Sequence, residues 1–201
     1  MQTATPTLVS LACLAPAAWL AFRLVQGNLG ANPAETLQLD TGIWALRFLI
    51  LTLAVTPVRR LTGWNHVIRY RRILGLFAFF YACLHLAAYA VLDRYMDFSG
   101  VWEDVIERPF ITAGMVALLA MLPLAVTSTN GWIRRLGRRW QTLHRLIYVS
   151  AIAAAVHYLW KVKIMSGSPV YYALIVAALL GFRLVWGFRR RTPKRPQPAA
   201  S

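Results

Sequence analysis

Two histidines in this sequence stand where membrane-spanning segments usually carry apolar side chains. His85 lies 12 residues after the start of the apolar stretch from Ile73 to Leu92, and His157 lies 11 residues after the start of the stretch from Leu146 to Trp160. With a helical rise of about 1.5 Å per residue, these positions are about 18 Å and about 16 Å along their segments. If both segments run in the same direction, the two imidazoles lie at one level of the membrane.

Paired imidazoles at one depth of a bilayer indicate a bound cofactor. An ionisable side chain inside a membrane is costly and marks a functional site, although a single histidine also serves to bond neighbouring helices. Alanines close to both histidines (Ala78, Ala82, Ala88, Ala151, Ala153, Ala154 and Ala155) leave room for a flat macrocycle. A zinc site would need three or four ligands. The pair therefore predicts a haem b with His85 and His157 as axial ligands, which transfers electrons because both axial positions are filled.

Four further residues are candidates for cofactor binding. His144 precedes His157 by 13 residues, about 20 Å along a helix, and a regular helix would turn it to a different face. It is either an interfacial histidine or a ligand of an inner cofactor whose helical phase is corrected by a π-bulge. Arg71 and Arg72 lie at that inner level and would face propionates or a flavin phosphate. Arg47 either extends its charged end toward the membrane surface (snorkelling) or pairs with a propionate of the haem held by His85 and His157.

The segments that must position these residues are apolar helices. The chain has 201 residues, of which 58% are hydrophobic and 14% are charged, far fewer charges than the roughly 25% of soluble domains. Six stretches are long enough to cross a membrane: Thr7 to Val25, Gly42 to Val58, Ile73 to Leu92, Phe110 to Thr127, Leu146 to Trp160 and Val170 to Phe188. We therefore expect an all-α integral membrane bundle of six transmembrane helices over residues 1–188. Residues 189–201 are expected to form a disordered, basic and Pro-rich cytoplasmic tail.

The formal net charge of +15 reflects membrane topology rather than nucleic-acid binding. Arginines gather between the second and third stretches, between the fourth and fifth, and after the sixth, whereas all seven acidic residues fall in the predicted loops 26–42 and 93–109. This distribution follows the positive-inside rule and predicts that both termini are cytoplasmic. Pro109 is expected in the first turn of the fourth helix. The sequence alone shows no compelling internal repeat.

Three segments resemble a known family: "RYRRILGLFAFFYACLHLAAY", "RPFITAGMVALLAMLPLAVTST" and "LGRRWQTLHRLIYVSAIAAAVHYLWKVK". They are similar to the haem-binding membrane subunits of bacterial periplasmic methionine sulfoxide reductase systems, within the ferric-reductase-like transmembrane group. The resemblance implies a non-catalytic electron-transfer subunit of the inner membrane that binds haem b, one or two copies, and FMN. It implies electrons taken from the quinone pool or a cytosolic flavin reductase and passed to a periplasmic molybdopterin-dependent catalytic subunit that repairs oxidised methionines.

The resemblance maps the family's ligand histidines onto His85, His144 and His157. The wider ferric-reductase group has two histidines on each of two helices, whereas the third stretch here contains only His85. Two other interpretations remain open. The histidines could relay protons in a transporter or channel, or the chain could be a stand-alone haem-anchoring protein.

Overall fold

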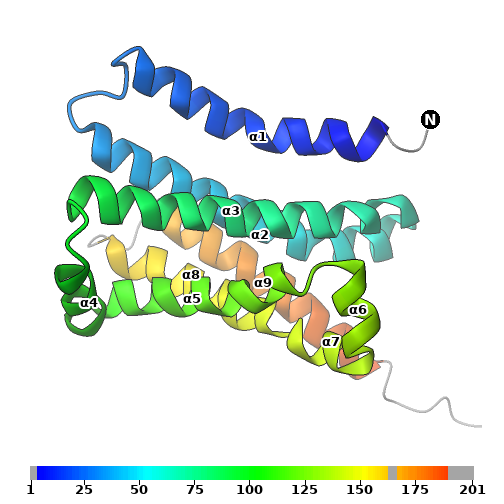
Figure 1. Ribbon diagram of the computed structural model, residues 1–201. Helices are drawn as coiled ribbons and strands as arrows, with labels where there is room; N and C mark the ends of the chain where they lie inside the picture. Colours follow the sequence, from blue (N-terminus) through cyan, green and yellow to red (C-terminus); the bar gives the residue numbers. More distant parts are fainter. Residues whose placement is uncertain (1–3, 163–166, 190–201) are drawn as a thin grey trace, which may run out of the picture.

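The computed structural model describes residues 4–162 and 167–189, and this part of the chain is helical without a strand (Figure 1). The elements are α1 (Ala4–Val25), α2 (Pro33–Thr62), η1 (Asn65–Arg69), α3 (Tyr70–Ala88), η2 (Tyr89–Asp93), α4 (Phe98–Glu107), α5 (Pro109–Val126), α6 (Asn130–Leu136), α7 (Arg138–Leu143), α8 (Leu146–Lys161) and α9 (Ser168–Arg189). The expected tail, residues 189–201, lies outside the described residues apart from Arg189, which ends α9.

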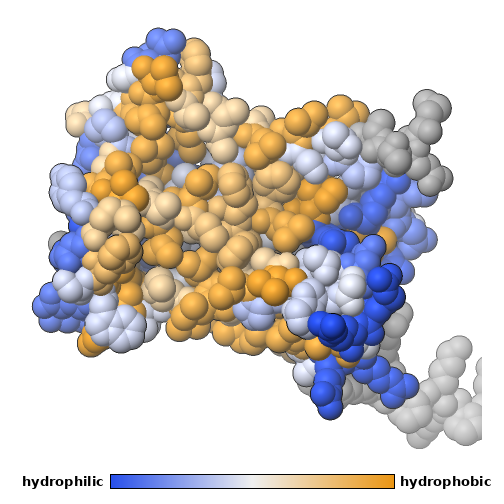
Figure 2. All heavy atoms as spheres, viewed as in Figure 1, coloured by the Kyte–Doolittle hydropathy of each residue, from blue (hydrophilic) through white to orange (hydrophobic). Residues whose placement is uncertain are grey.

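Five of the described helical segments are long and apolar enough to cross a membrane by length and composition: Pro6–Val25, Pro33–Thr62, Asn65–Asp93, Pro109–Val126 and Ser168–Trp186. The sixth predicted span corresponds to α8, which has 16 residues and is shorter than the roughly 20 residues of a full crossing. Figure 2 shows apolar side chains over the middle of the molecule and hydrophilic ones at both ends, including the end that carries α6 and α7. The chain is a multi-pass membrane protein.

Two helix pairs form the centre of the bundle. α2 packs most extensively against α3, and α5 against α8, while α9 packs against α8 and α2 (Figure 1). α1 lies at the outer edge against α3. The core between these helices is formed by side chains with almost no exposed surface, among them Leu49, Leu53, Ala78, Tyr81 and Ala151. The two pairs are thus held side by side by apolar packing.

The start of α2 differs from the sequence prediction. The helix begins at Pro33 rather than near Gly42, because Asn32 caps it by accepting a hydrogen bond from the Glu35 backbone N–H (3.2 Å) and proline suits the first turn. The predicted loop 26–42 therefore ends before residue 33, and Asp40 lies within the helix. This extension adds more than two turns and places the backbone of Gln38 beside α3.

The regular helix expected between His144 and His157 is interrupted. Gly137 separates α6 from α7. Its backbone angles, φ +51° and ψ −122°, are a conformation that favours glycine. His144 then ends α7, and a turn at residues 144–145 precedes α8. The helical phase between His144 and His157 therefore does not follow from regular geometry. No π-turn occurs near His144, and a π-helical turn lies instead at Tyr89–Asp93, directly after the helix of His85.

The connection from α3 to α5 contains the short amphipathic helix α4. Its Asp104 is buried and accepts bonds from the Tyr89 hydroxyl and from the guanidinium groups of Arg94 and Arg108. Burial raises the pKa of this carboxyl, but the hydrogen bonds from Tyr89 and Arg94 and the nearby positive charges outweigh it, so that the pKa is lowered. Asp104 therefore ties α4 to both neighbouring helices. Pro109 stands in the first turn of α5, as predicted.

Candidate functional site: a histidine pair in an apolar cavity

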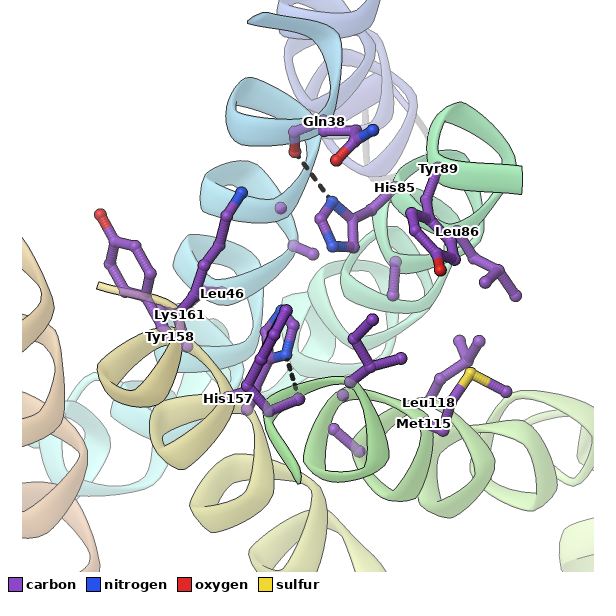
Figure 3. A pocket seen from close by; sticks show the side chains of 18 of the residues that line it. Gln38, Leu46, His85, Leu86, Tyr89, Met115, Leu118, His157, Tyr158 and Lys161 are labelled. Carbon is purple, nitrogen blue, oxygen red and sulfur yellow. Dashed lines mark hydrogen bonds between the residues drawn. The ribbon is translucent and has the colours of Figure 1, made fainter. Parts of the chain in front are cut away.

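His85 of α3 and His157 of α8 face each other across the centre of the bundle (Figure 3). Their ring centroids are 5.9 Å apart and their planes are inclined by 77°. The two residues are far apart in the sequence and come together because α3 and α8 belong to neighbouring helix pairs. The structure thus brings together the two histidines that the sequence placed at one level.

The Nδ1 atom of each ring is hydrogen-bonded to a backbone carbonyl of a neighbouring helix. His85 Nδ1 lies 2.8 Å from the Gln38 oxygen of α2, and His157 Nδ1 lies 2.6 Å from the Phe110 oxygen of α5. Because a carbonyl oxygen only accepts hydrogen bonds, Nδ1 must carry the proton in both neutral rings. Each Nε2 therefore keeps a free lone pair, the state required of a metal-binding histidine.

A cavity of about 330 Å³ surrounds the two rings, which is within the usual size range of cofactor and ligand sites. It is lined mainly by apolar side chains of α2, α3, α5 and α8, including Ala45, Ala82, Ala117 and Ala154. These small side chains leave space beside the imidazoles.

The donor set and the spacing fit a haem iron. Two metal–imidazole bonds of about 2 Å each, with the distance from each nitrogen to its ring centre, account for about 6 Å between centroids, close to the 5.9 Å observed. No group of three or more His, Cys, Asp or Glu side chains that could hold a metal ion occurs among residues 4–162 and 167–189. The site therefore suits a metal that needs only two protein ligands, as in a macrocycle.

Two cations line the cavity, and neither was predicted from the sequence. Lys161 stands one helical turn after His157, and Arg108 precedes α5. Lys161 lies at the predicted outer end of its helix, where a basic side chain is typical of the membrane interface. Its spacing of four residues from His157, which puts both on one face of α8, was the available signal.

Arg47 does not line the cavity. Its Nε donates to the Tyr172 hydroxyl of α9 (2.8 Å), and its guanidinium lies 4.8 Å from the centre of the Trp44 ring. The arginine is therefore directed toward α9. The position of a residue along α2 does not determine which face of the helix its side chain occupies.

The structure does not bring His144, Arg71 or Arg72 to the cavity. His144 stacks on Trp140 with ring centroids 3.8 Å apart, and its Nε2 lies 3.1 Å from the Thr127 hydroxyl. Burial, followed by the positive charge of Arg71, lowers the pKa of His144 and favours the neutral ring. Arg72 donates to the Asn130 side chain at 3.0 Å. These residues lie outside the cavity, at the end of the bundle that carries α6 and α7.

The fold and the site define a multi-pass membrane protein with a histidine pair arranged for a flat metal cofactor. Comparison with known proteins gives the family. The model of the "Ferric reductase like transmembrane component" family matches residues 41–155. The chain belongs to this family. Its relatives, described in the next paragraph, show that it also belongs to the protein-methionine-sulfoxide reductase heme-binding subunits MsrQ.

The relatives of this chain include three proteins named "Protein-methionine-sulfoxide reductase heme-binding subunit MsrQ". The protein of Rhodospirillum rubrum is 49% identical over 188 residues, which cover 93% of this chain and 90% of the relative. That of Xanthomonas euvesicatoria is 49% identical over 204 residues (97% and 93%). That of Brucella anthropi is 52% identical over 170 residues (85% and 77%). No solved structure matches the chain.

Proposed function

We propose that this chain is the haem b-binding electron-transfer subunit of a periplasmic methionine sulfoxide reductase system in a bacterial inner membrane. The observation that carries the proposal is the histidine pair, with both Nδ1 atoms bonded to carbonyls and both Nε2 lone pairs free toward one cavity. The relatives are named as heme-binding subunits of such a system, which supports the same assignment.

His85 and His157 would hold the haem iron, and Lys161 and Arg108 are the cations of the cavity wall that would face its propionates. When bound, a haem held by these two histidines would supply one-electron transfer. The carbonyls of Gln38 and Phe110 fix the tautomer and orientation of the rings. The mainly apolar wall would disfavour water beside the metal.

The same hydrogen bonds argue against a proton relay. A relaying imidazole takes a proton on one nitrogen and releases it from the other. Here each Nδ1 faces a backbone carbonyl that neither gives nor takes a proton. A transporter or channel function is therefore less consistent with the site than electron transfer.

The electron route follows from the topology that we propose. With α8 as the sixth crossing and both termini cytoplasmic, the arginine-rich end with α6 and α7 faces the cytoplasm and the cavity lies toward the periplasm. Electrons would enter from the quinone pool or a cytosolic flavin reductase and leave to a periplasmic molybdopterin enzyme. The polar group around His144, Arg71 and Arg72 lies at the entry side and is the place for a second haem or an FMN.

The test is the visible spectrum of the purified, haem-loaded protein and of two variants. His85→Ala and His157→Ala each leave a single protein ligand, so we expect each to lose the low-spin bis-histidine spectrum. His66→Ala is the matched control, because this histidine is exposed in η1. Wild-type spectra in both cavity variants would overturn the proposal, as would a fully folded wild-type protein that takes up no haem.

A further inference from the structure

Two glycines stand directly against the two histidines. A Cβ atom added to Gly42 would lie 3.0 Å from His85 Nδ1, and one added to Gly114 would lie 2.9 Å from His157 Nδ1. Carbon atoms do not approach a ring so closely without displacing it. Both glycines lie inside helices, α2 and α5, and neither has a positive φ. Their backbone does not need glycine, and the neighbouring ring is what excludes a side chain.

The glycines also stand one helical turn after the carbonyls that bond the rings. Gly42 follows Gln38 by four residues, and Gly114 follows Phe110 by four. In an α-helix the side chain of a residue tilts back over the turn before it, so that it covers the carbonyl four positions earlier. Without a side chain at that position, the second lone pair of the carbonyl is open to an imidazole N–H from another helix.

The same arrangement occurs twice at a constant spacing. Adding 72 to the numbers of Gln38, Gly42 and His85 gives Phe110, Gly114 and His157. The same shift pairs Ala45 with Ala117, Leu46 with Leu118, and Ala82 with Ala154 in the cavity wall. All the residues that line the cavity fall into such pairs except four: Asp93, Val101, Val105 and Arg108.

At the cavity, the helix pairs α2–α3 and α5–α8 therefore each supply a carbonyl, a glycine and a histidine at the same spacing. We propose that Gly42 and Gly114 are positioning residues, which hold the two imidazoles at the orientation needed for axial ligation by keeping the carbonyls of Gln38 and Phe110 accessible. This inference rests on the proposed function and adds to it the residues that set the geometry of the ligands.

The experiment compares Gly42→Ala and Gly114→Ala with two matched controls in the full chain. A Cβ on Gly75 of α3 would stand 3.6 Å from Thr52, an ordinary contact, and one on Gly181 of α9 meets nothing within 4 Å. Gly75→Ala and Gly181→Ala therefore test the effect of alanine in a helix without a ring against it.

The readouts are the electron paramagnetic resonance g values of the oxidised haem, its midpoint potential and its affinity. We expect both cavity variants to shift the g values and the potential and to weaken haem binding about tenfold or more, the range found when partners of metal-binding histidines are changed. Both controls should keep the wild-type values. Unchanged g values and potentials in both cavity variants would overturn the inference.

A second measurement needs no haem. In the apoprotein, Gly42→Ala should lower the thermal midpoint when His85 is present and leave it unchanged in the His85→Ala background, because the added methyl then meets no ring. An equal loss in both backgrounds would show a packing effect unrelated to the imidazole and would overturn the inference. If the wild-type protein showed no bis-histidine spectrum, the proposed function would fail, while this cycle would still report on the glycines.

Discussion

The hydroxyl of Tyr81 is inserted into the backbone of α1, and its removal should loosen that helix. Tyr81 of α3 is fully buried. Its hydroxyl accepts from the Ala17 N–H (2.9 Å) and donates to the Cys13 carbonyl (2.9 Å). These two backbone groups would bond each other in a regular helix, since they are four residues apart. Pro16 lies in the same turn and already removes one donor there. We expect Tyr81→Phe to destabilise the protein.

The magnitude follows from the two hydrogen bonds. A buried hydrogen bond contributes about 0.5–1.5 kcal/mol net, and an unsatisfied buried group costs about 1–3 kcal/mol. Because Cys13 and Ala17 can partly restore their own bond, we expect a total loss of about 1–3 kcal/mol. For a chain of this size each 1 kcal/mol lowers the midpoint by about 2–4 °C.

The assay is thermal unfolding of the purified apoprotein in detergent, followed by circular dichroism. Tyr171→Phe is the control, because Tyr171 is 67% exposed. Haem spectra of Tyr81→Phe should match those of the wild type, since Tyr81 does not line the cavity. A midpoint equal to that of Tyr171→Phe would refute the reasoning, because the bridge would then contribute nothing to stability.

Two further predictions concern Asp104 of α4 and Lys161 of α8. The pKa of Asp104 is lowered in the folded state, so its carboxylate stabilises the fold fully above the ordinary pKa of 3.8. This stabilisation is lost as the pH falls through the lower folded value. Asp104→Asn should therefore flatten the acid dependence of the thermal midpoint, and an unchanged pH profile would contradict the prediction. Lys161→Met should speed haem release to an excess of apomyoglobin, whereas Arg47→Leu should not, because only Lys161 lines the cavity; the opposite order would restore Arg47 as the propionate partner.

The helices and the level of the histidine pair could be predicted from the sequence because both depend on local patterns. Apolar length identifies a membrane segment, and a constant rise per residue converts position into depth. Counting from the segment starts placed His85 and His157 together, and their rings are 5.9 Å apart in the structure. The early start of α2 is marked in the sequence by Asn32, a capping residue, followed by Pro33. Hydropathy alone places the start of the helix too late.

The remaining features of the site depend on which face a side chain occupies and on contacts between distant segments. The contact of Arg47 with Tyr172 is set by the packing of α9 against α2. The helical phase expected for His144 does not apply, because a turn at residues 144–145 separates this residue from α8. Gly42 and Gly114 carried no local signal, since each acts on a histidine in another helix. Their equal spacing becomes visible only when the cavity wall is known.

The bonds between each ring and a carbonyl 47 residues earlier in the chain make the imidazole angle dependent on the relative position of two helices. Sliding α2 along α3 by a fraction of a turn would carry the Gln38 oxygen away from His85, and sliding α5 along α8 would do the same to His157. Ring orientation therefore reports helix register. A partner that docks on the ends of these helices and shifts one against the other would thereby change the ligand field, even from a surface that touches neither histidine.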